Sequence, residues 1–376
     1  MSTAFTRTDT SVVGRWWWTV DRWLLVATTV LFCIGMILTL AAGPPAAERI
    51  GADTFHFVRK QSVFLPLAIA VMLSISLMPP IFIRRFAVLG FCASLGLMLG
   101  TLIIGLEVNG AQRWLRVGPF SIQPSEFIKP FFVVVAAWMF ASQNDSDRIP
   151  GNLISIACLL IICSILIAQP DVGMTMVVVT VWSAQFFMAG LPIFWAVLII
   201  FAGLGSLVIA YLFFPHVASR VDRFLDPSSG DTYQISQAML AFKNGGLFGR
   251  GPGEGRVKEM LPDAHTDFIF AVAGEEFGVL LCLLIVTLFG FLVLRVMIKT
   301  LQENNLFILL AVGGLIFQFG LQAIINMASS LHMMPTKGMT LPFISYGGSS
   351  LIALAIGMGM ILGLTRRRRD SEGLQS

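Results

Sequence analysis

Apolar stretches of about twenty residues recur along this chain, with short polar segments between them. A stretch of that length allows a helix to cross a hydrocarbon layer of about 30 Å. Hydropathy windows of about nineteen residues place ten such stretches, at 23–43, 61–79, 86–106, 124–142, 151–168, 172–190, 193–214, 268–294, 306–328 and 349–365. We therefore expect an all-α integral membrane protein of about ten transmembrane helices.

Turn-forming residues fall between several of these stretches. Proline and glycine pairs mark turns, and they occur at Gly43-Pro44-Pro45, Met78-Pro79-Pro80, Gln169-Pro170-Asp171 and Gly190-Leu191-Pro192. We expect a single membrane domain over 23–365, preceded by a tail at 1–22 and followed by a basic tail at 366–376.

The composition supports a membrane protein and excludes a water-soluble core. Of 376 residues, 56% are hydrophobic and only 12% are charged, and the mean hydropathy is +0.83, whereas soluble domains carry about 25% charged residues. The net charge of +4 comes largely from basic residues that flank the apolar stretches, such as Arg366 to Arg369. That pattern is typical of a topology signal and gives little support to nucleic-acid binding. The five cysteines lie inside apolar stretches, which favours packed thiols over disulfides or metal ligands.

The distribution of basic residues favours cytoplasmic N- and C-termini. With both ends inside, the inner segments are richer in arginine and lysine than the short outer ones. Seven predicted helices then precede the long polar segment 215–266, and an odd number of crossings places this loop on the outer face of the membrane. We expect the chemistry to lie on that face.

The loop 215–266 is too long to be a simple connection, since loops beyond about 15 residues are usually functional or disordered. It mixes apolar and charged residues, so we expect it to be ordered. We expect an amphipathic segment at the membrane surface from Ile235 to Phe242.

The glycine-rich run 249–255 ends this loop together with nearby charges. The lysine and hydroxyl residue that complete a nucleotide P-loop are missing. The run is either a flexible connection or a backbone that approaches an anion, in which case Arg250, Arg256 and Lys258 could hold a diphosphate by charge-assisted bonds.

Acidic residues surround the start of the predicted eighth helix. Asp267 stands where a helix cap is expected, and a carboxylate there also suits the helix dipole. Glu275 and Glu276 follow about two turns later, where a charge is costly unless it has a partner or anchors the helix at the interface.

A second polar cluster covers Asn109 to Arg116 and Gln123 to Pro130. Glu126 and Lys129 are three residues apart, so they can pair on one helix face. Lys129 stands inside an apolar stretch and is either a functional residue or a side chain that reaches the interface. Trp114 suits the interfacial aromatic belt as well as a ligand contact.

A third cluster, Pro335 to Ser350, precedes the last predicted helix and is rich in proline, glycine and hydroxyl residues. Irregular backbone at membrane depth is tolerated only where it is buried in protein or lines a wet cavity. This cluster therefore predicts a polar vestibule.

Together the clusters resemble the SEDS family of bacterial membrane proteins, which polymerise peptidoglycan during elongation, division and sporulation. The resemblance covers nearly the whole chain and rests on these stretches: Asn109 to Pro130, Gln169 to Gly173, Arg223 to Pro227, Gly245 to Gly278 and Pro335 to Ser350. Gly251 to Lys258 and Pro335 to Gly338 look more like the division member of the family than the elongation member.

The resemblance implies a glycosyltransferase whose essential aspartate matches Asp267, with Arg113 and Lys129 in a central cavity. With the clusters above, the candidate substrate-binding residues are Arg113, Trp114, Glu126, Lys129, Arg256, Lys258, Glu259, His265, Thr266, Lys337, Ser345, Gly347, Gly348 and Ser349. It also implies a divalent cation, magnesium or manganese, with no ligand set defined. The implied partners are a class B penicillin-binding transpeptidase and other division proteins at the septum of the bacterial cytoplasmic membrane.

An enzyme facing outward has no nucleotide sugar available, so its substrate must arrive activated and anchored. Lipid II, a polyprenyl-diphosphate-linked disaccharide peptide, meets both needs. A diphosphate leaves without an acid catalyst if its charge is stabilised, so one base and a cationic clamp can suffice. Asp267 suits the base, and Arg113, Lys129, Arg256 or Lys258 suit the clamp. The alternatives are a lipid II flippase, an elongation-type polymerase and a non-catalytic division scaffold.

Overall fold

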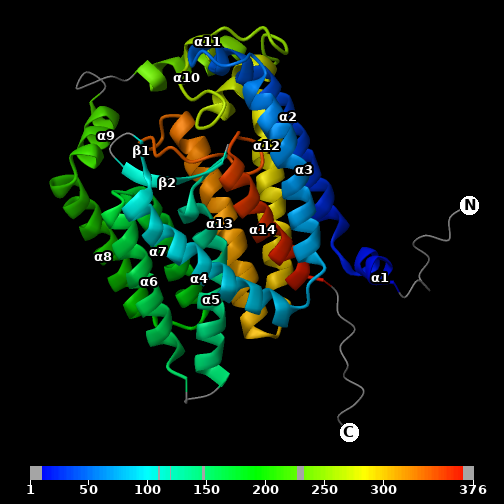
Figure 1. Cartoon of the computed structure of the whole chain (residues 1–376), viewed down its shortest axis with the longest axis vertical. Helices are drawn as coiled ribbons and strands as arrows, with labels where there is room; N and C mark the ends of the chain where they lie inside the picture. Colours follow the sequence, from blue (N-terminus) through cyan, green and yellow to red (C-terminus); the bar gives the residue numbers. More distant parts are fainter. Residues whose placement is uncertain (1–10, 109–110, 119, 146–148, 227–232, 367–376) are drawn as a thin grey trace, which may run out of the picture.

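The computed structural model describes residues 11–108, 111–118, 120–145, 149–226 and 233–366, and it has a helix at each of the ten predicted stretches (Figure 1). Within these residues, seven helices have the length and composition of a membrane span, and α7 and α14 are shorter apolar helices. The predicted all-α membrane fold is confirmed. In chain order the helices are α2 (Arg22–Arg49), α3 (His56–Ser76), α4 (Pro80–Ile104), α5 (Pro124–Asp145), α6 (Gly151–Ala168), α7 (Val172–Met188), α8 (Ile193–Phe213), α12 (Ile269–Thr300), α13 (Leu306–Ser330) and α14 (Gly348–Leu364).

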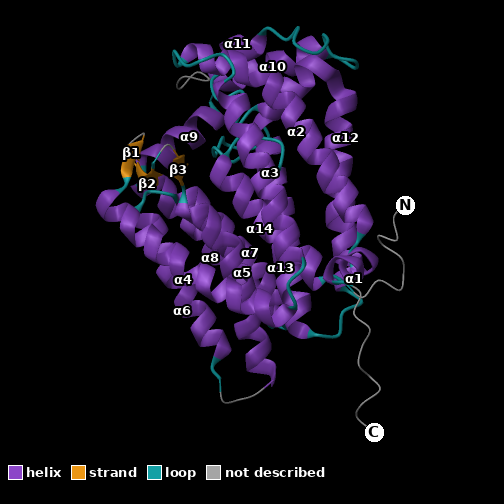
Figure 2. Cartoon of the chain, turned by 45° about the vertical axis from the view of Figure 1, so that its right-hand side comes forward, coloured by secondary structure: helices purple, strands orange, loops and turns teal. Residues whose placement is uncertain are grey.

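Shorter elements cover the two ends of this bundle. At one end lie α10, α11 and a small antiparallel sheet of strand order β1-β2-β3, whereas α1 lies toward the opposite end (Figure 2). The bounds are α1 (Val12–Thr19), β1 (Leu106–Val108), β2 (Ala111–Val117), β3 (Phe120–Ile122), α9 (Pro215–Leu225), α10 (Tyr233–Gly245) and α11 (Val257–Met260). Asn109, Gly110 and the predicted basic tail beyond Arg366 lie outside the described residues.

The long loop before the eighth predicted helix is ordered where the structure describes it. The predicted amphipathic segment falls inside α10, which buries Ala238 and Ala241 and packs against α12. Gly245 has no room for a Cβ because the backbone of Gly274 lies against it. The loop is therefore a folded layer on the helix bundle.

One predicted turn is wrong. Gly43-Pro44-Pro45 does not end the first membrane helix, because α2 continues through both prolines to Arg49. Prolines are tolerated in membrane helices where neighbouring groups satisfy the freed backbone. The extension carries Arg49 to α11, where its guanidinium donates to the carbonyl oxygens of Lys258 at 2.7 Å and Glu259 at 2.8 Å.

Helices α5, α13 and α14 form the centre of the bundle. In α5 and α13, 83% and 78% of the residues in the most apolar 18-residue stretch are buried, so protein rather than lipid surrounds these helices. Helix α14 packs closely on α3, because Gly359 and Gly363 leave space for the backbone and side chains around Met72 and Ile75. These central helices position the polar residues described below.

Helix α12 is interrupted at Gly278, whose φ of 75° and ψ of −173° are not helical. The glycine-rich loop fills the interruption: Arg250 N donates to Glu275 O at 2.9 Å, and Val279 N donates to Gly246 O at 3.0 Å. Neither Gly249 nor Gly278 has room for a Cβ, and both have positive φ. Gly249 and Gly278 thus allow a close backbone contact between the glycine-rich run and α12.

The same loop satisfies two fully buried carboxylates of α12. Glu275 accepts hydrogen bonds from Arg256 N at 3.1 Å and Val257 N at 3.0 Å. Glu276 accepts from Gly253 N at 3.1 Å and pairs with the Lys258 ammonium group, whose side chain is 7% exposed. The expectation that these acids need partners is confirmed, and their partners are the glycine loop and α11.

We predict that Lys258→Met destabilises the protein by about 3–5 kcal/mol, because it leaves the Glu276 carboxylate buried without its counter-charge. Adding Glu276→Gln should restore most of the lost thermal stability of the detergent-solubilised protein. Lys243→Met, at an exposed lysine of α10, is the matched control and should change stability little. Equal stability of Lys258→Met and the unaltered protein would contradict the ion pair.

Candidate functional site

A cavity of about 410 Å³ lies where the three polar clusters of the sequence meet. Its walls come from α3, the β-sheet, α5, the segment before α12, the segment before α14 and the first turn of α14. The lining residues are Lys60, Phe64, Trp114, Ser121, Gln123, Glu126, Thr266, Asp267, Gly338, Thr340, Tyr346, Gly347, Gly348, Ser349 and Ser350. The structure therefore brings together residues as far apart in the chain as Trp114 and Ser350.

The backbone around Asp267 is held from two sides. Asn326 of α13 donates its Nδ2 to the carbonyl oxygens of Asp267 at 2.9 Å and Met339 at 2.6 Å. Ser345 Oγ donates to Thr266 O at 2.6 Å, and Tyr346 N donates to His265 O at 3.0 Å. Residues 265–267 are thus fixed between α13 and the segment before α14.

The Asp267 side chain does not cap α12. That helix begins at Ile269, its N-cap residue is Phe268, and no side chain caps it. The capping hypothesis is therefore wrong, and the Asp267 carboxyl group instead borders the cavity. Its Oδ2 atom lies 3.3 Å from the point where a Cβ would stand on Gly338.

The surroundings of Asp267 favour its protonated form. Burial raises the pKa of Asp267 to about 7, the nearby Asp263 carboxylate adds to the rise, and Arg220 opposes it. No described residue donates a hydrogen bond to the carboxyl oxygens. A carboxyl group with a pKa near neutrality in a cavity is suited to proton transfer.

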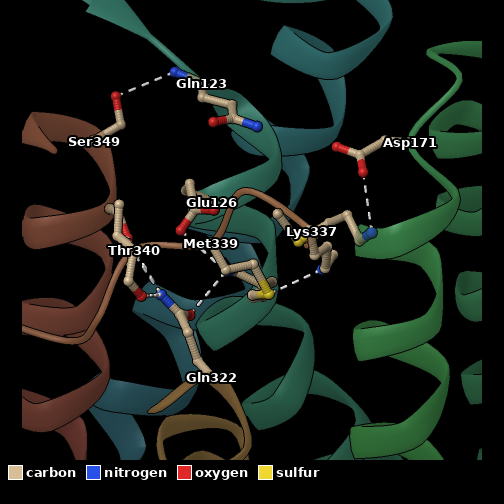
Figure 3. Close-up of polar contacts among 11 residues, drawn as sticks. Gln123, Glu126, Asp171, Gln322, Lys337, Met339, Thr340 and Ser349 are labelled. Atoms are coloured by element: carbon tan, nitrogen blue, oxygen red, sulfur yellow. Dashed lines mark hydrogen bonds and ion pairs between the residues drawn. The ribbon is translucent and has the colours of Figure 1, made fainter. Parts of the chain in front are cut away.

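A hydrogen-bonded chain links α5, α13 and α14, and three of its members, Glu126, Thr340 and Ser350, line the cavity. Lys129 Nζ bonds to Glu126 Oε2 at 3.0 Å and to Gln322 Oε1 at 3.1 Å, as the spacing of Glu126 and Lys129 predicts. Gln322 Nε2 donates to Thr340 O at 3.1 Å, and Thr340 bonds to Ser350 at 2.7 Å (Figure 3). Lys129 itself is only 3% exposed and is not among the residues that line the cavity.

The Arg113 side chain also bonds to another part of the fold. Its guanidinium donates to Gln169 O at 3.1 Å and to Pro170 O, and it lies 3.5 Å from Asp171 Oδ2. It therefore joins strand β2 to the turn between α6 and α7. The structure does not place Arg113 in the cavity.

Lys337, in the segment before α14, packs its side chain against α7. Its aliphatic chain lies against Gly173, where a side chain would collide with it, and its Nζ contacts Met339 Sδ at 3.0 Å (Figure 3). Burial lowers the pKa of Lys337 to about 7; Asp171 and Glu126 oppose this fall, and Lys129 and Arg220 add to it. Lys337 is not among the cavity-lining residues.

Aromatic side chains support the other edge of the site. The ring centroids of Phe57 and His265 are 4.1 Å apart, and those of Phe57 and Tyr346 are 5.0 Å apart. Burial and the nearby Arg49 lower the pKa of His265 to about 4, and burial raises the pKa of Tyr346 to about 12. Both rings are therefore neutral near pH 7.

Seven predicted site residues line the cavity: Trp114, Glu126, Thr266, Asp267, Gly347, Gly348 and Ser349. Eight do not: Arg113, Lys129, Arg256, Lys258, Glu259, His265, Lys337 and Ser345. Ser345 and His265 hold the backbone next to Asp267, whereas Lys258 belongs to the buried pair with Glu276. Whether any of these residues contacts substrate stays a prediction.

Lys60 and Phe64 also line the cavity, from α3, and lie outside the three polar clusters of the sequence. The available signal was a lysine directly before the predicted stretch 61–79, followed one turn later by an aromatic residue. That signal is weak, because basic and aromatic residues at helix ends also act as interfacial anchors.

The described residues contain no group of three or more histidine, cysteine, aspartate or glutamate side chains able to hold a metal ion. The acidic residues that line the cavity are Glu126 and Asp267. Magnesium is often bound by one or two carboxylates together with substrate phosphates. These donors fit an ion that arrives with a phosphorylated substrate better than a site made only by the protein.

Residues 22–370 match the family model for the FtsW, RodA and SpoVE proteins, described as cell cycle proteins. A relative from Caulobacter vibrioides, named "Probable peptidoglycan glycosyltransferase FtsW", is 45% identical over 98% of this chain and 95% of its own length. A relative of the same name from Tolumonas auensis is 34% identical over 93% of both chains.

Solved structures show the same fold. One chain, from a study of the coordination of polymerization and crosslinking by a peptidoglycan synthase complex, matches with a TM-score of 0.73 and 26% identity over 92% of this chain and 97% of that one. The rod shape determining protein RodA of Thermus thermophilus matches with a TM-score of 0.67 and 26% identity over 93% and 97% of the two chains.

We predict that Gly338→Ala disturbs the Asp267 carboxyl group as well as the local backbone. The residue has a φ of +72°, and its new methyl group would stand 3.3 Å from Asp267 Oδ2. Gly51→Ala is the matched control, since Gly51 has a φ of +67° and no atom within 4 Å of a Cβ.

Both alanine variants should lose a similar amount of thermal stability from backbone strain, about 1 kcal/mol. Only Gly338→Ala should lose most of the activity of the purified protein. Equal activity of the two variants would show that the contact with Asp267 is unimportant.

Proposed function

Since this chain belongs to the family of cell cycle proteins that contains FtsW, RodA and SpoVE, we propose that it is a peptidoglycan glycosyltransferase that polymerises lipid II at the division septum. The relatives that it matches over nearly its full length carry the name FtsW, which supports the division type over the elongation type. The observation that carries the proposal is the Asp267 carboxyl group, which borders the shared cavity and caps no helix.

In the proposed reaction the hydroxyl group of an acceptor sugar attacks the anomeric carbon of a lipid-linked donor. Asp267 takes the proton of that hydroxyl, a new glycosidic bond forms, and the bond from the anomeric carbon to the diphosphate oxygen breaks with its electron pair. General-base assistance contributes about 10²–10⁴-fold. One displacement at the anomeric carbon inverts its configuration, and no covalent sugar adduct forms on Asp267.

A divalent cation remains a proposal for this chain. Bound together with the substrate, it would neutralise part of the diphosphate charge. Because the described residues offer no cluster of three metal-binding side chains, the oxygens of the diphosphate would supply much of its coordination.

We propose that the cavity opens on the outer side of the membrane and that both termini are cytoplasmic. The connecting segments at the end of the bundle where α1 lies contain more arginine and lysine than the short segments at the opposite end, which supports this orientation. We also propose a class B penicillin-binding transpeptidase as partner, which the likeness to a chain from a peptidoglycan synthase complex supports.

A lipid II flippase is the second candidate, and the interruption of α12 at Gly278 favours it, because discontinuous helices are common in transporters. A vesicle assay that scores translocation and polymerisation separately distinguishes the two functions. Translocation without polymer formation would reject the proposed reaction.

We predict that Asp267→Asn inserts and folds normally but forms no polymer from purified lipid II, a loss of at least about 10²-fold. The substitution keeps the size of the side chain and removes its ability to accept a proton. Gel analysis of glycan strands measures the activity. Retained polymerisation by the Asn variant would reject Asp267 as the base.

The raised pKa of Asp267 also predicts how pH affects rate and stability. The carboxylate needed as base falls about tenfold for each pH unit below about 7, so polymerisation should fall with it.

Between pH 4 and 7 the folded protein keeps a proton on Asp267 that the unfolded chain has lost, so folding stability falls as pH rises. Asp267→Asn should therefore gain thermal stability relative to the unaltered protein from pH 4 up to about 7, with a constant difference above. A difference independent of pH would contradict the raised pKa.

A further inference from the structure

Helix α3 forms a wall of the cavity that none of the sequence motifs identifies. Lys60 and Phe64 are four residues apart, so they lie on the same face of α3, and both line the cavity. The Phe64 ring covers Gly348, where a Cβ would stand only 2.7 Å from its Cζ atom. This contact packs α3 against the start of α14 on the face of α3 that also carries Lys60.

Lys60 shares the cavity wall with two carboxyl groups and forms an ion pair with neither of them. The charged residues that line the cavity are Lys60, Glu126 and Asp267. Glu126 already pairs with Lys129 at 3.0 Å, and no ion pair joins Lys60 to Asp267. None of the ion pairs found among the described residues includes Lys60.

The cations that the sequence offered as a clamp are used elsewhere in the fold or lie off the cavity wall. Lys129 bonds to Glu126 and Gln322, and Arg113 bonds to the turn between α6 and α7. Lys258 bonds to Glu276 and to Gly253 O. Arg256 is exposed and is not among the lining residues. Lys60 is therefore the basic side chain that the described part of the cavity presents to a ligand.

We propose that Lys60 binds the diphosphate of the lipid-linked sugar substrate in this cavity. The inference rests on the proposed function, since it assigns a residue to the same reaction. When the bond from the anomeric carbon to the diphosphate oxygen breaks, its electron pair adds negative charge to that oxygen, and the Lys60 ammonium group stabilises the charge. The proton of the attacking hydroxyl goes to Asp267, so the step balances without another reactant.

The donor and the acceptor both carry a diphosphate in this reaction. Kinetic measurements show which of the two diphosphates Lys60 binds. The diphosphate of the donor gains charge in the transition state, so losing its cation lowers kcat. The diphosphate of the acceptor is unchanged by the reaction, so losing its cation raises KM and leaves kcat unchanged.

The test compares Lys60→Gln, Lys60→Arg and the matched control Arg59→Gln in polymerisation of purified lipid II. Arg59 is the neighbouring cation; it pairs with Asp53 on the surface and does not line the cavity. We expect Lys60→Gln to lower kcat/KM by about 10²–10³-fold. Lys60→Arg should keep most of the activity, and Arg59→Gln should match the unaltered protein. Equal activity of Lys60→Gln and Arg59→Gln would overturn the assignment.

A second measurement probes binding rather than turnover. Farnesyl diphosphate and farnesyl monophosphate are added as competitors, and the inhibition constant of each is measured for the unaltered protein and for Lys60→Arg, which remains active. The unaltered protein should bind the diphosphate more tightly than the monophosphate. Direct binding of both compounds to Lys60→Gln should show this preference reduced at least tenfold, and an unchanged preference would overturn the proposal.

Asp267→Asn in the same assay separates this inference from the proposed function. If the unaltered protein polymerises lipid II, Asp267→Asn does not, and Lys60→Gln behaves as the unaltered protein, only the role of Lys60 is rejected. If Asp267→Asn polymerises lipid II as well as the unaltered protein does, the proposed base is rejected first. Thermal unfolding of each variant in detergent checks that a loss of rate is not a loss of fold.

Discussion

The site depends on how the protein satisfies two carboxylates, Glu275 and Glu276, that are fully buried in the first part of α12. An uncompensated charge at such a position costs several kcal/mol. The backbone amides of the glycine-rich loop and the Lys258 ammonium group satisfy both carboxylates. The loop then holds α11, and α11 is tied to the end of α2 through Arg49. The segment that carries Asp267 follows directly, so its position is a consequence of these buried bonds.

Hydrophobic patterning was sufficient to locate the helices, because a membrane helix must be both apolar and long. Local signals were less reliable where tertiary contacts decide the outcome. Pro44 and Pro45 predicted a turn, yet α2 continues through them. Asp267 suited a helix cap, yet α12 starts two residues later with no side-chain cap. In both cases contacts from distant parts of the chain also hold the segment, α11 for the end of α2 and α13 for Asp267.

The candidate clamp shows the same limit for charged residues. A sequence identifies a cation but not its counter-ion, unless the two are neighbours on one helix, as with Glu126 and Lys129. The partners of Arg113 and Lys258 lie on other elements, and these contacts keep both side chains in structural bonds. Lys60 carries no such signal in the sequence, because a lysine at the end of a predicted membrane helix is commonly an interfacial anchor. The three polar clusters were still found, since polar residues at membrane depth are costly and therefore stand out.

Asn326 affects the energetics of this site through the main chain of Asp267. Its single amide nitrogen holds the carbonyl oxygens of both Asp267 and Met339, so the aspartate is oriented through its main chain. When an acceptor sugar enters, the carboxyl oxygens of Asp267 need not give up a hydrogen bond to the protein in order to form one to the substrate. The reorganisation energy of the polar groups around the sugar hydroxyl is then small, and the orientation required for proton transfer was already established during folding.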